Sequence, residues 1–225
     1  MPNVGLRINA LINRPAPELI SAFRDLPVAS IGDSVNRTFC MDSSIRPYTS
    51  HALLGPAFTV KVRPGDNLLL HKALDMAAPG DIIVVDGQGD MSNALIGELM
   101  VMWAIKRRLG GIIIDGAIRD VSRLKTLSIP VYAAGVTPAG PYKEGPGEIT
   151  FPVVCGGVVV NPGDIIVGDA DGVVVINPRD AHSVLEKASA KSRDEQQTLQ
   201  DIENGSWDRT WVEALLKAKG CEPSR

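Results

Sequence analysis

The sequence predicts an α/β fold in which parallel strands alternate with helices. Three short apolar runs, at residues 82–86, 112–115 and 130–135, have the length and composition of strands buried on both faces. A helical pattern over residues 97–109 separates the first two runs and ends at a pair of glycines. Because strand, helix and strand follow one another, we expect the strands to pair in parallel.

The remaining elements follow from helical periodicity, turn residues and Val-rich stretches. In chain order we expect a helix at 15–26, a segment without clear pattern to about 52, a strand from Leu54, a helix at 65–77, a loop at 87–93, helical turns at 121–127, mostly strands over 149–176, helices at 179–203 and 207–219, and frayed residues at 222–225. The segment PGDIIV occurs at 79–84 and again at 162–167, and a shorter Pro-Gly-Asp lies at 64–66. In each of the two longer copies we expect a turn in which the aspartate caps the entry to a strand.

Composition indicates one globular domain over residues 1–225. Of these residues 44% are hydrophobic and 22% are charged, which are ordinary globular values. No change of composition marks a linker. We therefore divide the chain only into an N-terminal helical segment at about 1–53, a core at about 54–177 and C-terminal helices at about 178–220.

Charge and hydropathy exclude several classes of protein. A net charge of −3 and a pI of 5.6 give no basic surface for nucleic acid. No apolar run reaches the roughly 18 residues of a membrane span, and prolines interrupt the N-terminal segment where a signal peptide would need an apolar run. We expect a cytoplasmic protein that binds neither nucleic acid nor membrane. The scattered Cys40, Cys155 and Cys221 predict neither a disulfide framework nor a zinc site.

Three common catalytic or nucleotide-binding motifs are absent. The sequence contains neither the GxSxG of serine hydrolases nor the HExxH of zinc proteases. The stretch VVDGQGD at 84–90 lacks the third glycine of a dinucleotide-binding loop, and a tight turn after a strand explains it better. His51, His71 and His182 are scattered, and for each a surface or core position is the simpler interpretation.

One constellation of charged residues remains. Glu98 opens the helix predicted at 97–109, and Arg119 and Asp120 occupy the turn after the strand at 112–115. Such turns, at the carboxyl ends of strands, are where open α/β sheets place ligands. From spacing alone, a binding site and an ion pair that fastens a loop explain the Arg-Asp pair about equally well.

Residues from about 55 to 176 resemble the family of 4-hydroxy-4-methyl-2-oxoglutarate aldolases and regulators of ribonuclease activity A. The shared signature is an acidic residue, twenty intervening residues and then Arg-Asp, which here is Glu98 followed by Arg119-Asp120. The surrounding sequence also matches, in the segments GDNLLLHKAL, APGDIIVVDGQGD, GELM, GIIIDGAIRD and PGDIIVGDADGVVVI. In this setting the motif is specific to the family, but not to one activity within it.

The resemblance implies a layered α/β/β/α sandwich that assembles as a homotrimer or homohexamer. It also implies a divalent-metal aldolase that cleaves 4-hydroxy-2-oxo acids to pyruvate through an enolate and decarboxylates oxaloacetate. The position of Asp120 would ligate Mg²⁺ or Mn²⁺, which can bind both oxygens of a 2-oxo acid and stabilise negative charge. Arg119 would contact the substrate's oxygens, and Glu98 would orient water on the metal. The loop whose backbone amides would hold the substrate carboxylate comprises Gly97, Glu98, Leu99 and Met100.

The resemblance further implies an active site at a subunit boundary, with carboxylates borrowed from the neighbouring subunit. Asp33 matches one such position loosely, and Glu195 is our choice for the other. Simpler explanations stay open, because Asp33 could cap a helix and Glu195 lies in a charged stretch where most residues face water.

One residue departs from the family pattern. Members proposed as aldolases commonly carry an acidic residue three positions after the Asp, where this chain has Arg123. The change is either a harmless surface substitution or a sign of altered acid–base chemistry or of a different substrate. It keeps open a second function, that of a non-catalytic regulator that binds a partner protein. A third function, methyl transfer, would need a methyl-donor loop that the sequence does not contain.

Overall fold

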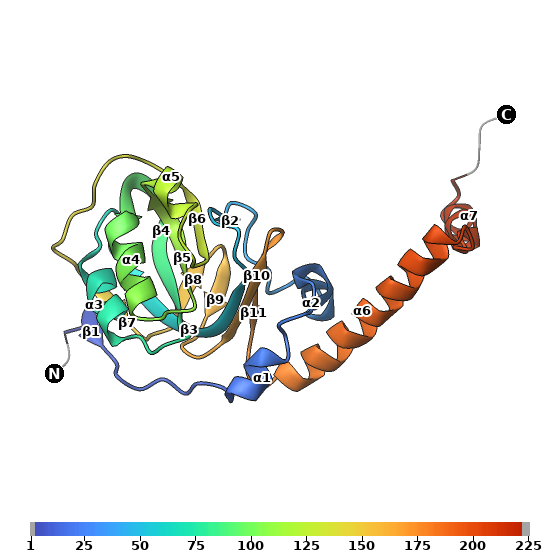
Figure 1. The fold of residues 1–225 in the computed structure, drawn as a ribbon, viewed down its shortest axis with the longest axis horizontal. Helices are drawn as coiled ribbons and strands as arrows, with labels where there is room; N and C mark the ends of the chain where they lie inside the picture. Colours follow the sequence, from blue (N-terminus) through green and yellow to red (C-terminus); the bar gives the residue numbers. More distant parts are fainter. Residues whose placement is uncertain (1–2, 222–225) are drawn as a thin grey trace.

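Four parallel strands form the centre of the structure. The computed structural model describes residues 3–221, and within it β3 (Leu53–Val62), β4 (Ile82–Ile96), β5 (Gly111–Ile118) and β6 (Val131–Val136) pair in that order. Each neighbouring pair is parallel, as the alternation of strands and helices predicts (Figure 1). Parallel strands need crossover connections, and helices supply most of them here.

Strand β3 joins the parallel strands to a second layer of strands. Its second half pairs with β4, whereas its first half pairs in antiparallel fashion with β10 (Ile165–Asp169). Strand β10 turns back into β11 (Gly172–Ile176). The other strands are short, namely β1 (Leu6–Ile8) and β7 (Gly147–Ile149) beyond β3, β2 (Arg46–Pro47) beyond β6, and the hairpin of β8 (Val153–Cys155) and β9 (Val158–Val160).

Helices form the two outer layers. On the parallel sheet lie α3 (Leu68–Met76), α4 (Glu98–Lys106) and α5 (Val121–Leu124). Against β10 and β11 lie α1 (Pro17–Ser21), α2 (Val28–Ser34) and the first part of α6 (Ala181–Glu203). The layers therefore follow the order helices, parallel strands, second strands, helices. This order confirms the α/β/β/α sandwich that the resemblance implies.

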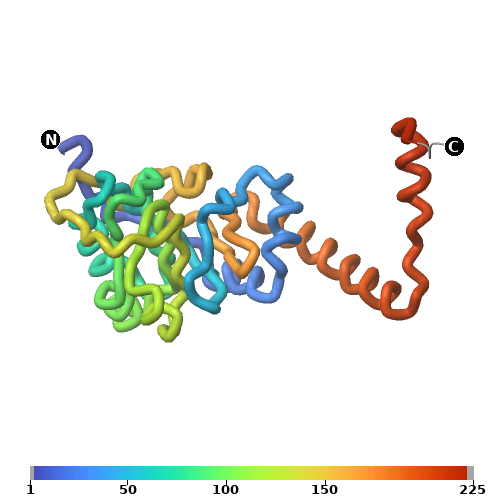
Figure 2. Tube along the Cα trace, turned by 90° about the horizontal axis from the view of Figure 1, so that it is seen from above, coloured from blue at the N-terminus to red at the C-terminus, as the bar shows by residue number. Residues whose placement is uncertain are grey.

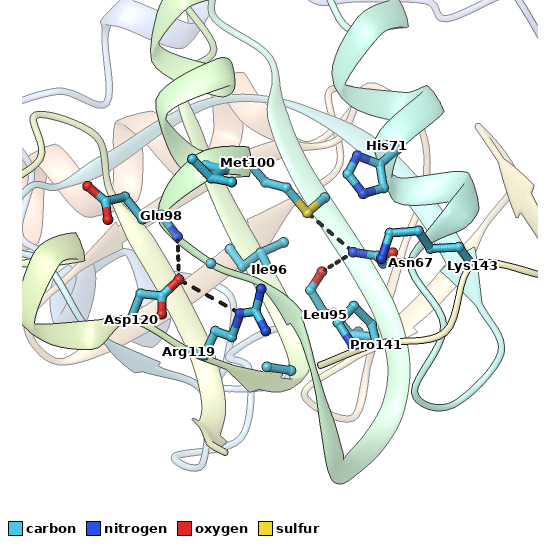
Figure 3. A pocket seen from close by; sticks show the side chains of 13 residues that line it. Asn67, His71, Leu95, Ile96, Glu98, Met100, Arg119, Asp120, Pro141 and Lys143 are labelled. Carbon is cyan, nitrogen blue, oxygen red and sulfur yellow. Dashed lines mark hydrogen bonds and ion pairs between the residues drawn. The ribbon is translucent and has the colours of Figure 1, made fainter. Parts of the chain in front are cut away.

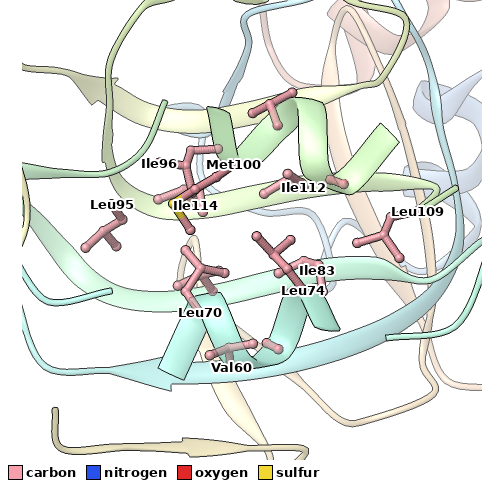
Figure 4. Packing of buried hydrophobic residues seen from close by; sticks show 14 of the residues in the cluster. Val60, Leu70, Leu74, Ile83, Leu95, Ile96, Met100, Leu109, Ile112 and Ile114 are labelled. Carbon is pink, nitrogen blue, oxygen red and sulfur yellow. The ribbon is translucent and has the colours of Figure 1, made fainter. Parts of the chain in front are cut away.

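Alternation of side chains along the strands builds three apolar cores between the four layers. In β4, Ile83 and Val85 belong to the core beneath α3 and α4, where Figure 4 shows Ile83, whereas Ile82 and Val84 belong to the core shared with the second layer of strands. All four side chains are 0% exposed, and each contributes about 1.5–3 kcal/mol of transfer free energy on burial. In β11, Val174 belongs to the third core, beneath the outer helices.

The Pro-Gly-Asp turns at 79–81 and 162–164 are built alike. Asp81 accepts the backbone N–H of Ala78 at 2.8 Å, and Asp164 accepts that of Asn161 at 2.7 Å. Each turn leads directly into a strand, β4 or β10. The predicted role of the aspartate is confirmed in both copies.

Some local predictions were wrong. Residues 87–93 do not leave the sheet as a loop, because bulged pairing with β5 carries β4 on to Ile96. The helix expected at 15–26 has only five residues, and α2 forms where no pattern was expected. Pro27 separates the two helices, since the residue before a proline disfavours the helical conformation. The expected fraying of residues 222–225 lies outside the described residues.

The C-terminal helices extend away from the layered body (Figure 2). Helix α6 buries only Ala181, Val184 and Ala188, all in its first third. Helix α7 (Thr210–Ala218) buries no residue. Within residues 3–221, no helix combines the length and the apolar character needed to cross a membrane.

Candidate functional site

The carboxyl ends of β4 and β5 bring the signature residues together (Figure 3). The backbone N–H of Arg119 donates to the carbonyl of Ile96, the last residue of β4, at 3.0 Å. The backbone N–H of Glu98 donates to Oδ2 of Asp120, also at 3.0 Å. Between Glu98 and Arg119 the chain runs through α4 and back along β5. The spacing of the motif is therefore set by one helix, the turn after it and the strand that returns to the site.

The backbone at Gly97 and Asp120 fits this contact. A Cβ atom on Gly97 would overlap the carboxylate of Asp120 and lie 3.0 Å from Cγ of Arg119, so a larger residue would displace both side chains. Asp120 has a φ of 62°, a left-handed conformation that aspartate tolerates better than most residues. The turn directs its carboxylate to the first turn of α4, where the helix dipole favours negative charge.

The ion pair between Arg119 and Asp120 holds the loop only weakly. Nε of Arg119 lies 3.8 Å from Oδ2 of Asp120, and the two side chains are 43% and 42% exposed. A pair of this length and exposure contributes at most about 1 kcal/mol. The better contact of Asp120 is with the Glu98 amide. This geometry favours a binding site over an ion pair whose purpose is to fasten a loop.

Arg123, the residue that departs from the family pattern, contacts Glu98 directly. It lies on α5, and its Nε donates to Oε1 of Glu98 at 3.0 Å, with the Arg123 side chain 63% exposed and that of Glu98 27% exposed. The pair lies at the rim of the site. Through this contact the positive charge of Arg123 offsets the negative charge of Glu98, the carboxylate that is expected to orient water. The substitution therefore acts on a residue of the signature and is not a remote surface change.

These residues line one end of a cavity of about 290 Å³. The cavity is lined by Asn67, His71, Ala94, Leu95, Ile96, Gly97, Glu98, Leu99, Met100, Arg119, Asp120, Pro141 and Lys143. All the residues predicted to bind substrate or metal thus share one cavity. Asn67, His71 and Lys143 lie at the opposite end from Asp120 (Figure 3).

Asn67 is held rigidly but keeps an unused acceptor. Its Nδ2 donates to the carbonyl of Leu95 at 2.9 Å and lies 3.3 Å from the sulfur of Met100. The residue is 2% exposed, and its Oδ1 is buried without a partner among the described residues. A buried acceptor without a donor is costly, so a ligand that donates a hydrogen bond there would remove the cost.

The far end of the cavity has a positive character. Although much of His71 is exposed, partial burial lowers the pKa of its imidazole, and the charge of Lys143 lowers it further against the opposing effect of Asp75. His71 is thus mainly neutral at neutral pH, and Lys143 carries the positive charge. An anionic group is the natural ligand of this end.

Sequence reasoning missed the residues at this far end. It treated His71 as a surface or core residue, and it did not single out Asn67 or Lys143. Asn67 stands at the N-cap of α3, a signal that indicates a helix start but not a site. Lys143 lies in a loop 45 residues beyond Glu98 and carries no local signal at all.

Asp33 and Glu195 lie together on α2 and α6, on the opposite outer layer from α4 (Figure 1). Lys191 Nζ lies 3.0 Å from Asp33 and 3.2 Å from Glu195, and Ser30 donates to Glu195 at 2.9 Å. The bond from Lys191 is the main cause that lowers the pKa of Asp33. Asp33 is in the last turn of α2, so it is not the helix N-cap.

Neither Asp33 nor Glu195 lines the cavity of its own chain. Their predicted role in the site therefore requires a neighbouring subunit and stays a prediction. The two carboxylates do lie in one cluster around Lys191. With 161 residues between them, no local pattern in the sequence predicts this proximity.

Comparison with known proteins gives a consistent result. A family model described as Aldolase/RraA, RraA-like, matches residues 28–175. A curated relative from Halalkalibacterium halodurans, named "Putative 4-hydroxy-4-methyl-2-oxoglutarate aldolase", is 41% identical over 201 residues, which cover 88% of this chain and 96% of the relative.

Solved structures share the fold. RraAS2 of Streptomyces coelicolor, described as an unusual member of the RNase ES inhibitor RraA protein family, has a TM-score of 0.74 and 27% identity, covering 82% of this chain and 96% of its own. An uncharacterized protein from Pseudomonas syringae has a TM-score of 0.77 over 86% of this chain and 96% of its own, and at 24% identity this likeness concerns the fold alone. With its signature residues inside the matched segment, the chain belongs to the RraA-like, Aldolase/RraA family.

Proposed function

We propose that this protein is a divalent-metal-dependent aldolase that cleaves 4-hydroxy-2-oxo acids to pyruvate and also decarboxylates oxaloacetate. The observation that carries the proposal is the convergence of the Asp120 carboxylate, the Arg119 guanidinium and the first turn of α4 in one cavity. In both reactions the carbon beside the keto group of a 2-oxo acid loses a substituent through cleavage of a carbon–carbon bond. Both therefore leave the enolate of pyruvate. One site can therefore serve both.

The residues present fit Mg²⁺ or Mn²⁺ held mainly by water and substrate. Asp120 offers a hard carboxylate oxygen, and Oδ1 accepts no hydrogen bond from the described residues. Within residues 3–221 no cluster of three or more His, Cys, Asp or Glu side chains is arranged to hold a metal. Such a donor set suits Mg²⁺, which retains waters and often takes one or two protein carboxylates. When bound, the cation supplies Lewis acidity that stabilises the enolate charge.

The chain's own groups would position the 2-oxo acid. The backbone N–H groups of Leu99 and Met100, in the first turn of α4, have no acceptor among the described residues and suit a carboxylate. The Arg119 guanidinium adds a fixed positive charge and paired donors beside the same oxygens. Lys143 at the far end suits a second anionic group of the substrate, and Asn67 Oδ1 suits a hydroxyl donor.

A coupled assay for pyruvate release tests the proposal. Purified protein is offered a panel of 4-hydroxy-2-oxo acids and oxaloacetate, with Mg²⁺ or Mn²⁺ and after complete removal of metal by EDTA. We expect turnover that needs metal and that Arg119→Ala lowers by about a hundredfold or more, as for loss of a charge-stabilising group. Undiminished turnover without metal would exclude this mechanism.

A non-catalytic, protein-binding regulator is the alternative, and two observations favour it. Arg123 engages the carboxylate of Glu98, and the fold matches that of RraAS2, whose family is described as RNase ES inhibitors. Arg123→Asp, which restores the acidic residue typical of the family's aldolases, separates the two functions. Activity in the parent protein supports the aldolase. Activity only in the variant, with capture of a ribonuclease by the parent, supports the regulator.

A further inference from the structure

The shorter Pro-Gly-Asp segment, at residues 64–66, is built differently from the two that lead into strands. In those two copies the aspartate accepts a backbone N–H from three residues earlier in the chain. Asp66 instead leads into helix α3, where its Oδ1 accepts the N–H of Leu68 at 2.9 Å. Its Oδ2 accepts two N–H groups from far along the chain, those of Glu144 at 2.6 Å and Gly145 at 3.0 Å. Asp66 therefore joins two segments that are distant in sequence.

Burial makes this carboxylate a strong anchor. Asp66 is 1% exposed, so water does not compete for the N–H groups that its two oxygens bind. Hydrogen bonds to a carboxylate are about twice as strong as those between neutral groups. Two backbone bonds continue the contact, from the N–H of Tyr142 to the carbonyl of Gly65 at 2.8 Å and from the N–H of Asn67 to the carbonyl of Tyr142 at 3.0 Å. The segment 142–145 is thus fixed to the start of α3.

Lys143 lies inside the segment that Asp66 fixes. Lys143 lines the candidate cavity near Asn67, at the end opposite Asp120 (Figure 3). Among residues 3–221 no carboxylate forms an ion pair with it. Its side chain is exposed, and a long lysine side chain loses much conformational freedom when it binds an anion. A fixed backbone lowers that cost, because only the side chain remains to be ordered.

The remaining contacts of this loop lie before Lys143. Strand β4 holds the loop at the carbonyl groups of Ala139 and Gly140, which accept hydrogen bonds of 2.8 and 2.5 Å. Within the described chain, Asp66 is the side chain that is hydrogen-bonded to the backbone of residues 142–145. The position of the Lys143 backbone therefore depends on Asp66 more than on any other side chain.

We propose that Asp66 is a positioning residue for the candidate site. Its buried carboxylate fixes the backbone that follows Lys143, so that the ammonium group lies where a second anionic group of the substrate arrives. The ligand that benefits is a 2-oxo acid with two carboxylates. For the role of Lys143 this inference rests on the proposed function, but the anchoring itself requires no turnover. Asp66 acts through Lys143 and does not touch the substrate.

Hydrogen exchange tests the anchor without any ligand. Peptides that cover residues 140–148 are followed by mass spectrometry. In Asp66→Ser, whose hydroxyl can still accept the N–H of Leu68 but falls one bond short of the loop, exchange there should be about tenfold faster or more. Asp164→Ser is the matched control, because it removes the buried aspartate of another Pro-Gly-Asp turn, away from the cavity. Exchange in the control should equal that of the parent, and equal exchange in Asp66→Ser would overturn the proposal.

Two ligands of equal length that the protein cannot cleave measure the effect on Lys143. The compound 2-oxoglutarate carries a second carboxylate where 2-oxopentanoate has a methyl group, and neither has the hydroxyl group that aldol cleavage needs. With Mn²⁺ present, calorimetry should give a dissociation constant for 2-oxoglutarate about fivefold higher in Asp66→Ser than in the parent, as for a weakened ion pair. The constant for 2-oxopentanoate should stay within about twofold, and Asp164→Ser should change neither. Lys143→Ala should show the same pattern as Asp66→Ser, and the double variant should lose little more than either.

The outcomes separate this role from the proposed function. If the parent releases no pyruvate but the binding pattern holds, the aldolase function fails and the positioning role is supported. Equal affinity of the parent for the two ligands, or a loss in Lys143→Ala that Asp66→Ser does not reproduce, would exclude the positioning role. Additive losses in the double variant would show that Asp66 does not act through Lys143. If Asp66→Ser does not fold, Asp66→Asn, which keeps one acceptor oxygen, should give smaller changes in the same direction, and no change would contradict the role.

Discussion

Gly97→Ala tests how the site is held together. The backbone at Gly97, with φ −149° and ψ −169°, is open to alanine, so the effect must come from the added methyl group. That group would overlap the Asp120 carboxylate. We expect the Asp120 side chain to rotate away from the Glu98 amide to remove this overlap. The 3.0 Å hydrogen bond between them involves a charged acceptor and is worth about 1.5–3 kcal/mol.

This energy predicts a loss of about 10- to 150-fold in affinity for Mn²⁺. Metal affinity is measured by calorimetric titration, and kcat/KM for pyruvate release should fall at least as much. Global stability should fall by about 0.5–2.5 kcal/mol, because the restriction that alanine places on the unfolded chain offsets only part of the lost hydrogen bond. Urea denaturation provides that measurement.

Gly140→Ala is the matched control. A Cβ atom there would lie 3.1 Å from Nη1 of Arg119, the mobile end of a long side chain, with no other heavy atom close by. It should leave Mn²⁺ affinity within about twofold, as surface changes usually do. If Gly97→Ala binds Mn²⁺ as tightly as the parent, the proposed support of Asp120 by the start of α4 is incorrect.

Three further predictions concern the site residues. Asp120→Ala should lose saturable Mn²⁺ binding, whereas Glu98→Ala should lower kcat more than metal affinity, as calorimetry and the pyruvate assay will show. Mixing inactive Asp33→Ala and Asp120→Ala proteins under subunit exchange should restore part of the activity in a homotrimer or homohexamer, and mixtures that stay inactive argue against shared sites. The pKa of His71 is lowered in the folded protein. As pH falls below about 6.5, the imidazole is therefore protonated more readily in the unfolded chain than in the folded one, and the free energy of unfolding should decrease. In His71→Gln the free energy of unfolding, measured by urea denaturation, should depend less on pH in this range. The same pH dependence as in the parent would exclude the effect.

Local patterns in the sequence were enough to predict the elements near the centre of the fold. Ile82 to Val85 and Ile112 to Ile114 are buried on both faces, and that requirement makes each run continuously apolar. The Pro-Gly-Asp turns were predictable for the same reason, since the aspartate bonds only three residues back. Resemblance to the family then supplied the link between Glu98 and the pair Arg119-Asp120, and the four-layer order.

Contacts between distant segments could not be predicted in this way. Asn67 and Lys143 meet at one cavity only because the order of strands in the sheet brings their loops together. The pairing of Arg123 with Glu98 depends on α5 lying beside the start of α4. The sequence by itself determined the strands and helices near the centre of the fold, because periodicity expresses burial. Tertiary structure alone decided which side chains share a site, because that depends on how the layers pack.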